Sequence, residues 1–170
     1  MNKELKKFRN KIDNFFGWVK VTELVELEDI DVSEDPVRPE LDLEWRTSYG
    51  RKIFGLKYND EIEGIICIAY TSDIPSSTKE LDLMSQNAHF KEDADTAVAY
   101  TVWSRKRGAG KEIIGKVGEL MKQDQRIKNL VTLSPLTPMA THFHIRNGAK
   151  QFAINNTTQN FKYDLNEKKG

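Results

Sequence analysis

The 170-residue sequence has a single cysteine, no long apolar run and no net charge, since 26 lysines and arginines balance 26 aspartates and glutamates. With Cys67 as its only thiol, the chain cannot form an internal disulfide, and a reducing compartment is the simpler expectation. No stretch approaches the roughly 20 apolar residues of a transmembrane helix. Balanced charge excludes bulk attraction to nucleic acid or acidic lipid. We therefore expect a cytoplasmic protein with no integral membrane segment and no nucleic-acid partner; the oligomeric state is not indicated.

Residues 1–18 lack the continuous apolar stretch of a signal peptide but show a helical pattern. Four of their apolar residues recur at helical spacing beside lysines and arginines: Leu5, Phe8, Ile12 and Phe15. We predict an amphipathic basic helix over residues 1–18 that covers the edge of the domain, with a membrane-surface role as the alternative. Residues 19–170 fit one domain, because about 100 to 200 residues per domain is usual.

Strand patterns dominate the rest of the chain. Alternating or clustered apolar residues between turn signals predict strands over 18–30, 51–58, 62–70, 96–104, 130–135, 151–158 and 160–165. The second and third strands form a hairpin around a turn at Asn59 and Asp60. Residues 23–44 are strongly acidic and predict a solvated loop or short helices. Residues 71–95 are polar and predict an irregular, turn-rich segment, and Cys67 is expected to be a small core residue.

Two segments show helix patterns. A long helix is predicted after Gly110, with apolar residues on one face: Ile113, Ile114, Val117, Leu120 and Met121. A short helix is predicted within residues 139–149 and ends at Gly148.

The sharpest local signal is the basic glycine loop that opens the long helix. It consists of Arg105, Lys106, Arg107, Gly108, Ala109, Gly110 and Lys111. Such a loop directs backbone N–H groups and the positive end of the helix dipole toward one place, where anions bind. It is not a P-loop, because Glu112 stands where Ser or Thr should hold magnesium, and it is not a Rossmann fingerprint, because only one Gly-x-Gly is present. A phosphate ligand is predicted, with a solvated loop as the alternative.

The order of elements gives this loop a context. The pattern Arg105-x-x-Gly108-x-Gly110, after a strand and before a long helix, resembles the pyrophosphate-binding motif of the GNAT acyltransferase superfamily. The resemblance implies an α/β (α+β) fold with a mixed, mostly antiparallel sheet flanked by helices in a single domain. It also implies that the loop amides hold the pyrophosphate of coenzyme A. The substrate arm would lie between the strand before the loop and residues 130–135, with the thioester near Ser134.

Two further motifs are more specific. The segments LSPLTP, from Leu133, and FHIRNGA, from Phe143, resemble the paired motifs of the catalytic domain of malonyl-CoA decarboxylase, itself a GNAT fold. Residues 51–58, 65–77 and 160–163 resemble that family's second strand, third strand with its loop, and terminal tyrosine motif, so the likeness runs from about Glu44 to Tyr163. The sequence shows no counterpart of the family's helical N-terminal domain or of the long segment between the paired motifs.

By motif position, Ser134 and His144 take the places of the family's catalytic serine and histidine. Tyr163 matches its active-site tyrosine, Glu112 matches an acidic residue linked to the site, and Phe161 replaces a tyrosine. The resemblance implies a coenzyme A thioester, acetyl-CoA or malonyl-CoA, as the substrate. Decarboxylation of a malonyl thioester needs hydrogen-bond donors at the thioester oxygen and a proton for the carbon, and these side chains can supply both.

Alternatives remain for each motif. A serine before proline often only ends a strand, a histidine in a short helix is often structural, and Glu112 is a favourable acid for a first helical turn. His142 and His144 have no third ligand at a recognised spacing, so no metal site is predicted. The functions considered are a malonyl-CoA-decarboxylase-like enzyme, a GNAT acyltransferase that acts on an amine drawn to the acidic segment, and a non-catalytic coenzyme A-binding module.

Overall fold

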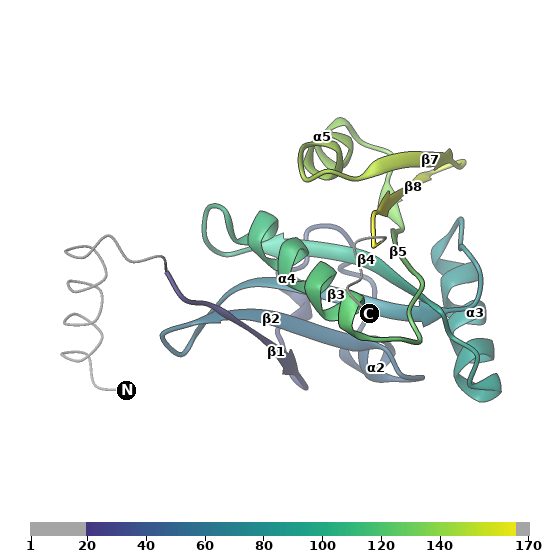
Figure 1. The fold of residues 1–170 in the computed structure, drawn as a ribbon, viewed down its shortest axis with the longest axis horizontal. Coiled ribbons are helices and arrows are strands. Elements are labelled where there is room, and N and C mark those ends of the chain that lie inside the picture. The colour runs from purple at the N-terminus through teal and green to yellow at the C-terminus, as the bar shows by residue number, and fades with distance from the viewer. Residues whose placement is uncertain (1–19, 166–170) are drawn as a thin grey trace.

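A mixed sheet of eight strands forms the centre of the protein (Figure 1). The computed structural model describes residues 20–165. The strands are β1 (Glu23–Leu27), β2 (Lys52–Tyr58), β3 (Glu61–Thr71), β4 (Thr96–Ser104), β5 (Asn129–Thr132), β6 (Ser134–Pro135), β7 (Lys150–Ile154) and β8 (Thr158–Tyr163). Their order is β1-β2-β3-β4-β5-β8-β6, and β7 pairs with β8. Among the strands of residues 20–165, only the β4–β5 pair is parallel, which confirms the predicted mixed, mostly antiparallel sheet.

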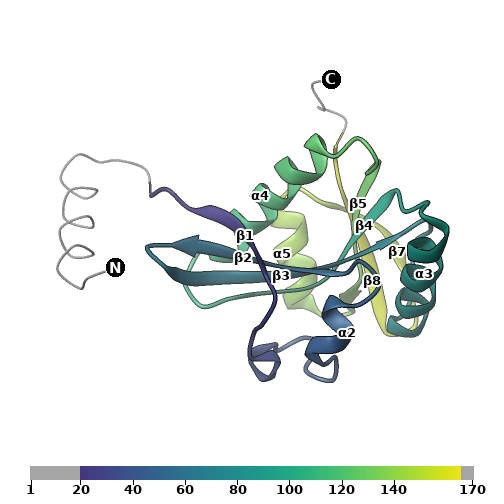
Figure 2. The same cartoon turned by 90° about the horizontal axis from the view of Figure 1, so that it is seen from below.

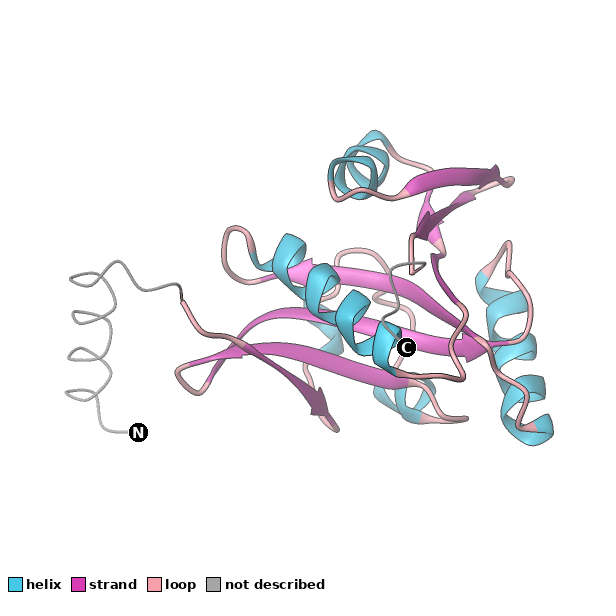
Figure 3. Ribbon diagram, in the orientation of Figure 1, coloured by secondary structure: helices cyan, strands magenta, loops and turns pink. Residues whose placement is uncertain are grey.

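Helices lie on both faces of the sheet (Figure 2). They are the short η1 (Val32–Glu34), α2 (Leu43–Thr47), α3 (Thr78–Lys91), α4 (Ala109–Gln123) and α5 (Pro138–Arg146), coloured cyan in Figure 3. Helix α4 covers one face, where its buried Ile113 and Val117 pack on Ile66 and Ile68 of β3. The opposite face packs on α2 and α3, with Leu81 of α3 in the core. Leu120 was predicted on the buried apolar face of α4 but is 37% exposed.

The hairpin, the two predicted helices and the buried Cys67 agree with their sequence signals. Asn59 and Asp60 both adopt a positive φ, of 48° and 64°, as a tight two-residue turn requires. Gly148, with φ 93°, follows the last turn of α5. Cys67 is fully buried, and desolvation raises the pKa of its thiol to about 11, so it is an inert core residue.

The prediction of an irregular segment over residues 71–95 is wrong, because Thr78–Lys91 is the 14-residue helix α3. Ser77 caps its first turn by accepting from the N–H of Glu80, and the Glu80 carboxylate accepts in return from the backbone N–H of Ser76. The apolar stripe is too narrow to stand out, since Leu81 and Ala88 are its only buried apolar residues.

The prediction that residues 23–44 are solvated is also wrong in part. The first five residues, Glu23–Leu27, form edge strand β1, which lies within the strand predicted over residues 18–30. Asp35 is 1% exposed and forms a buried ion pair of 2.7 Å with Arg46. Composition describes the segment as a whole. It cannot show which single carboxylate becomes buried and pairs with an arginine outside the segment.

An opening between β4 and β5 follows from how far these two strands pair. Their parallel register runs from Thr96–Asn129 to Ala99–Thr132, and the N–H of Leu133 donates to the carbonyl of Ala99. Beyond this point β4 continues beside β3, with an irregularity in their pairing at Tyr100. Strand β5 ends, and the chain continues into β6, which pairs with β8. The two strands therefore separate, and their separation positions the site.

The predicted helix over residues 1–18 lies outside the described residues. In the part of the chain that is described, no helix is long and apolar enough to span a membrane.

Candidate active site

The basic glycine loop connects β4 to α4. Gly108 adopts a left-handed φ of 84° and precedes the first residue of the helix, Ala109. The backbone N–H groups of Arg105 and Lys106 both donate to the carbonyl of Glu63, which fixes the start of the loop against β3. The N–H of Ala109 donates to the carbonyl of Lys106, and the first intrahelical bond is donated by Glu112, so the N–H groups of Gly110 and Lys111 remain available to an anion.

The charged side chains of the loop do not all point to one place. Arg105 is paired with Glu34 through two hydrogen bonds of 2.9 and 3.0 Å. The Glu112 carboxylate accepts a hydrogen bond from the Thr22 hydroxyl, which joins the first turn of α4 to the residue before β1. Glu112 lines none of the cavities described below, and Lys111 borders a second cavity of about 600 Å³ between α4 and α5.

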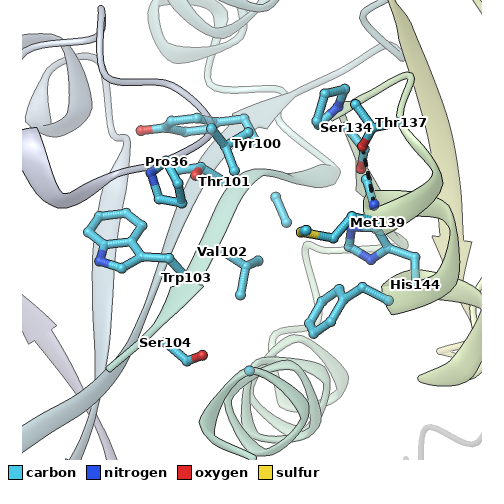
Figure 4. A pocket seen from close by; sticks show the side chains of 16 residues that line it. Pro36, Tyr100, Thr101, Val102, Trp103, Ser104, Ser134, Thr137, Met139 and His144 are labelled. Atoms are coloured by element: carbon cyan, nitrogen blue, oxygen red, sulfur yellow. Dashed lines mark hydrogen bonds between the residues drawn. The ribbon is translucent and has the colours of Figure 1, made fainter. Parts of the chain in front are cut away.

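A cavity of about 380 Å³ lies where β4 and β5 separate. Gly110 of α4 is on its wall, together with the second half of β4, the residues after β5 and the first turns of α5. In Figure 4, Pro36, Tyr100 and Trp103 lie on one side, and Ser134, Met139 and His144 lie on the other. A Cβ at position 110 would be 3.0 Å from the Phe143 ring, so a larger residue there requires that ring to shift. The cavity thus joins the loop to two of the predicted catalytic residues.

His144 is a buried histidine of α5, 6% exposed. Its Nδ1 is 2.8 Å from the Tyr163 hydroxyl, and its ring stacks on Phe161 with centroids 5.1 Å apart. Burial lowers the pKa of His144 to about 4 and raises that of Tyr163, so both are neutral at pH 7. Nε2 has no hydrogen-bond partner among residues 20–165, and His144 lines the cavity. One ring nitrogen is therefore held by Tyr163 and the other is left for a ligand.

Ser134 reaches the same cavity from the strand end and is 4% exposed. Its hydroxyl is bonded to Thr132, with the two oxygens 2.8 Å apart, and Thr132 Oγ1 also accepts from the N–H of Phe161. The serine and the histidine thus share a cavity, but each has its own hydrogen-bond partner. Thr132 was not predicted; its signal is the two-residue period of a strand, which places it on the same side as Ser134.

The described residues contain no group of three or more His, Cys, Asp or Glu side chains that could hold a metal ion. The expectation that the reaction needs no metal stays a prediction.

No family model matches the sequence, and no curated protein matches it. Solved structures do match. Malonyl-CoA decarboxylase from Rhodopseudomonas palustris is 17% identical with a TM-score of 0.66, and the match covers 96% of this chain and 64% of that one. The decarboxylase from Cupriavidus metallidurans is 15% identical with a TM-score of 0.63, covering 95% and 66%. The loading GNATL domain of CurA from Lyngbya majuscula is 15% identical with a TM-score of 0.63, covering 86% and 98%.

This chain has a GNAT fold. The fold resembles that of malonyl-CoA decarboxylase, as the sequence motifs predict, although the chain spans only about two thirds of the length of the two decarboxylases. Other GNAT-fold matches include the GphF GNAT-like decarboxylase in complex with isobutyryl-CoA and the N-acetyltransferase PseH of Campylobacter jejuni in complex with acetyl coenzyme A. Identities this low establish the GNAT fold alone, so the chemistry must be argued from the site.

Proposed function

We propose that this protein binds a short acyl-CoA thioester and decarboxylates it, converting malonyl-CoA to acetyl-CoA and carbon dioxide. The observation that carries the proposal is a single cavity whose wall includes Gly110 of the anion-binding helix end, Ser134 and His144. The pyrophosphate of coenzyme A would bind the first-turn N–H groups of α4. Its thioester arm would extend between the separated strands β4 and β5, which places the acyl group beside the serine and the histidine.

The chemistry of the cavity suits decarboxylation. Loss of carbon dioxide leaves the bond electrons on an enolate, so the site needs donors for the enolate oxygen and a proton for the carbon. If the Tyr163 hydroxyl donates to Nδ1, the neutral His144 carries its proton on Nε2, which faces the ligand. The Ser134 hydroxyl donates to Thr132 Oγ1 in the structure, and rotation of this hydroxyl into the cavity would turn its proton to the enolate oxygen. A preorganised donor of this kind is worth about 10² to 10³ in rate.

His144 would deliver the proton in this proposal. As Nε2 gives its proton to the enolate carbon, Nδ1 takes the hydroxyl proton of Tyr163, so the ring stays neutral. Solvent then protonates Nε2 while Nδ1 returns its proton to the Tyr163 oxygen, which restores the starting tautomer. Since the Tyr163 hydroxyl is engaged with His144, its role is to hold the tautomer and relay a proton, in place of direct contact with the enolate or the carboxylate.

The test is to incubate the purified full-length protein with malonyl-CoA and follow acetyl-CoA by mass spectrometry. His144→Ala and Ser134→Ala should each lower turnover by about 10² or more, with coenzyme A affinity nearly unchanged. His142→Ala is the matched control, because His142 lies on the same helix and is exposed. Malonyl-CoA that persists with the wild type would refute the decarboxylase assignment.

Acyl transfer to an amine is the second candidate, because some GNAT-fold matches are acetyltransferases. The reaction requires a base for the amine. The cavity wall in the described structure carries no Asp or Glu, and His144, with its pKa lowered to about 4, is a weak base. Incubation with acetyl-CoA and a panel of amines tests this candidate through thiol release. Binding of coenzyme A without turnover of any thioester would instead support the non-catalytic module.

A further inference from the structure

A buried arginine lies at the point where β4 and β5 separate. The last bond between these strands runs from the N–H of Leu133 to the carbonyl of Ala99, over 3.0 Å. Immediately beyond it, the Arg38 guanidinium donates from Nε to the carbonyl of Tyr100, at 3.4 Å, and from Nη2 to the carbonyl of Leu133, at 3.2 Å. One side chain therefore bridges the two strands where their own ladder ends.

The environment of Arg38 is unusual for a structural arginine. The residue is 9% exposed, and its guanidinium has no carboxylate within ion-pair distance among residues 20–165. Asp35, the buried acid nearby, is paired with Arg46 and meets Arg38 only at its backbone N–H. Glu40 and Asp35 act on the guanidinium only through their charge, and its hydrogen bonds go to carbonyl oxygens. A buried charge in this setting is costly unless its hydrogen bonds compensate. The fork of the guanidinium suits two carbonyls on separate strands, a geometry that lysine cannot reproduce.

The same loop forms part of the cavity wall. Pro36 and Val37 line the cavity, and they lie between Asp35 and Arg38 in the sequence. Asp35 fixes the start of the Pro36–Val37 segment by accepting a hydrogen bond from Thr101 Oγ1 of β4 at 2.8 Å. Arg38 fixes the other end across both strands. Figure 4 shows Pro36 beside Tyr100 and Thr101, facing Ser134 and His144 across the opening.

We propose that Arg38 is a positioning residue that sets the width of the opening between β4 and β5 so that an acyl-thioester arm fits between them. It touches the strands and not the reacting atoms, and it acts through the carbonyls of Tyr100 and Leu133. The proposal rests on the proposed function to the extent that the cavity takes such an arm. The phosphate-binding end at Gly108 to Lys111 lies outside the bridge, so the two halves of coenzyme A depend on Arg38 differently.

The experiment compares two probes by titration calorimetry. Adenosine 3′,5′-bisphosphate carries two of the three phosphates of coenzyme A and no thioester arm, whereas acetyl-CoA carries all three phosphates and the arm. In Arg38→Met and Arg38→Lys, acetyl-CoA should bind about tenfold or more weakly, because the two strands lose the bridge that holds the opening at the width of the arm. Bisphosphate affinity should change by less than about twofold, because the phosphate-binding end lies outside the bridge. Arg51→Met is the matched control, since Arg51 is 2% exposed and bonds α3 and the carbonyl of Trp45, away from the cavity.

The outcomes separate this proposal from the proposed function. If both Arg38 variants weaken the two probes equally, or leave acetyl-CoA binding intact, the positioning role is refuted. An equal selective loss in Arg51→Met would also refute it, because general destabilisation would then explain the effect. If Arg38→Met does not fold, Arg38→Lys alone decides. Because both probes are scored by binding, the result holds whether or not the wild type decarboxylates malonyl-CoA.

Discussion

The buried, neutral His144 predicts a specific loss of stability in acid. Its pKa is lowered from 6.5 to about 4 by burial, whereas in the unfolded chain it returns to its ordinary value. Between these two values the unfolded state binds a proton that the folded state does not, so stability falls as the pH falls. The contribution is fully present above about pH 6.5. By pH 4.5 the two pKa values correspond to a loss of about 2 to 3 kcal/mol.

The assay is urea unfolding of the wild type and of His144→Gln at pH 7.5 and pH 4.5. Carboxylates also titrate in this range, but they do so in both proteins, so the difference between the two pH dependences isolates His144. The wild type should lose about 2 to 3 kcal/mol more than the variant. His142→Ala should behave as the wild type. Equal pH dependence of the wild type and His144→Gln would refute the desolvation argument, and titration of the ring by NMR gives the pKa directly.

Two further substitutions test the packing around the site. Gly110→Ala places a Cβ 3.0 Å from the Phe143 ring, so we expect this variant to bind acetyl-CoA more weakly in calorimetry. Gly115→Ala is the control and should bind acetyl-CoA normally, because nothing lies within 4 Å of the added Cβ. Weaker binding by both variants would contradict the predicted contact with Phe143. Asp35→Asn leaves the fully buried Arg46 without its carboxylate, so thermal or urea unfolding should show a loss of about 3 to 5 kcal/mol. Stability within about 0.5 kcal/mol of the wild type, the range of ordinary surface substitutions, would mean that the pair is not desolvated.

Local patterns were sufficient for most elements of the fold. The hairpin at Asn59 and Asp60, the glycine loop before α4 and the end of α5 at Gly148 all depend on backbone conformations that a few neighbouring residues determine. Helix α3 was missed because its buried stripe includes Ser85, so that the pattern reads as polar. Its capping serine and glutamate were present in the sequence and could have indicated it.

The sequence by itself determined which chemical groups are present and, through motif likeness, predicted that Ser134 and His144 lie together, and both line one cavity. Tertiary structure alone decided their partners, because those partners are distant in the chain. Tyr163 meets His144 from 19 residues away, and Arg38 reaches the carbonyl of Leu133 across 95 residues. Desolvation depends on all the atoms that surround a group, so the neutral histidine and the buried arginine arise only when sheet, loop and helix pack together.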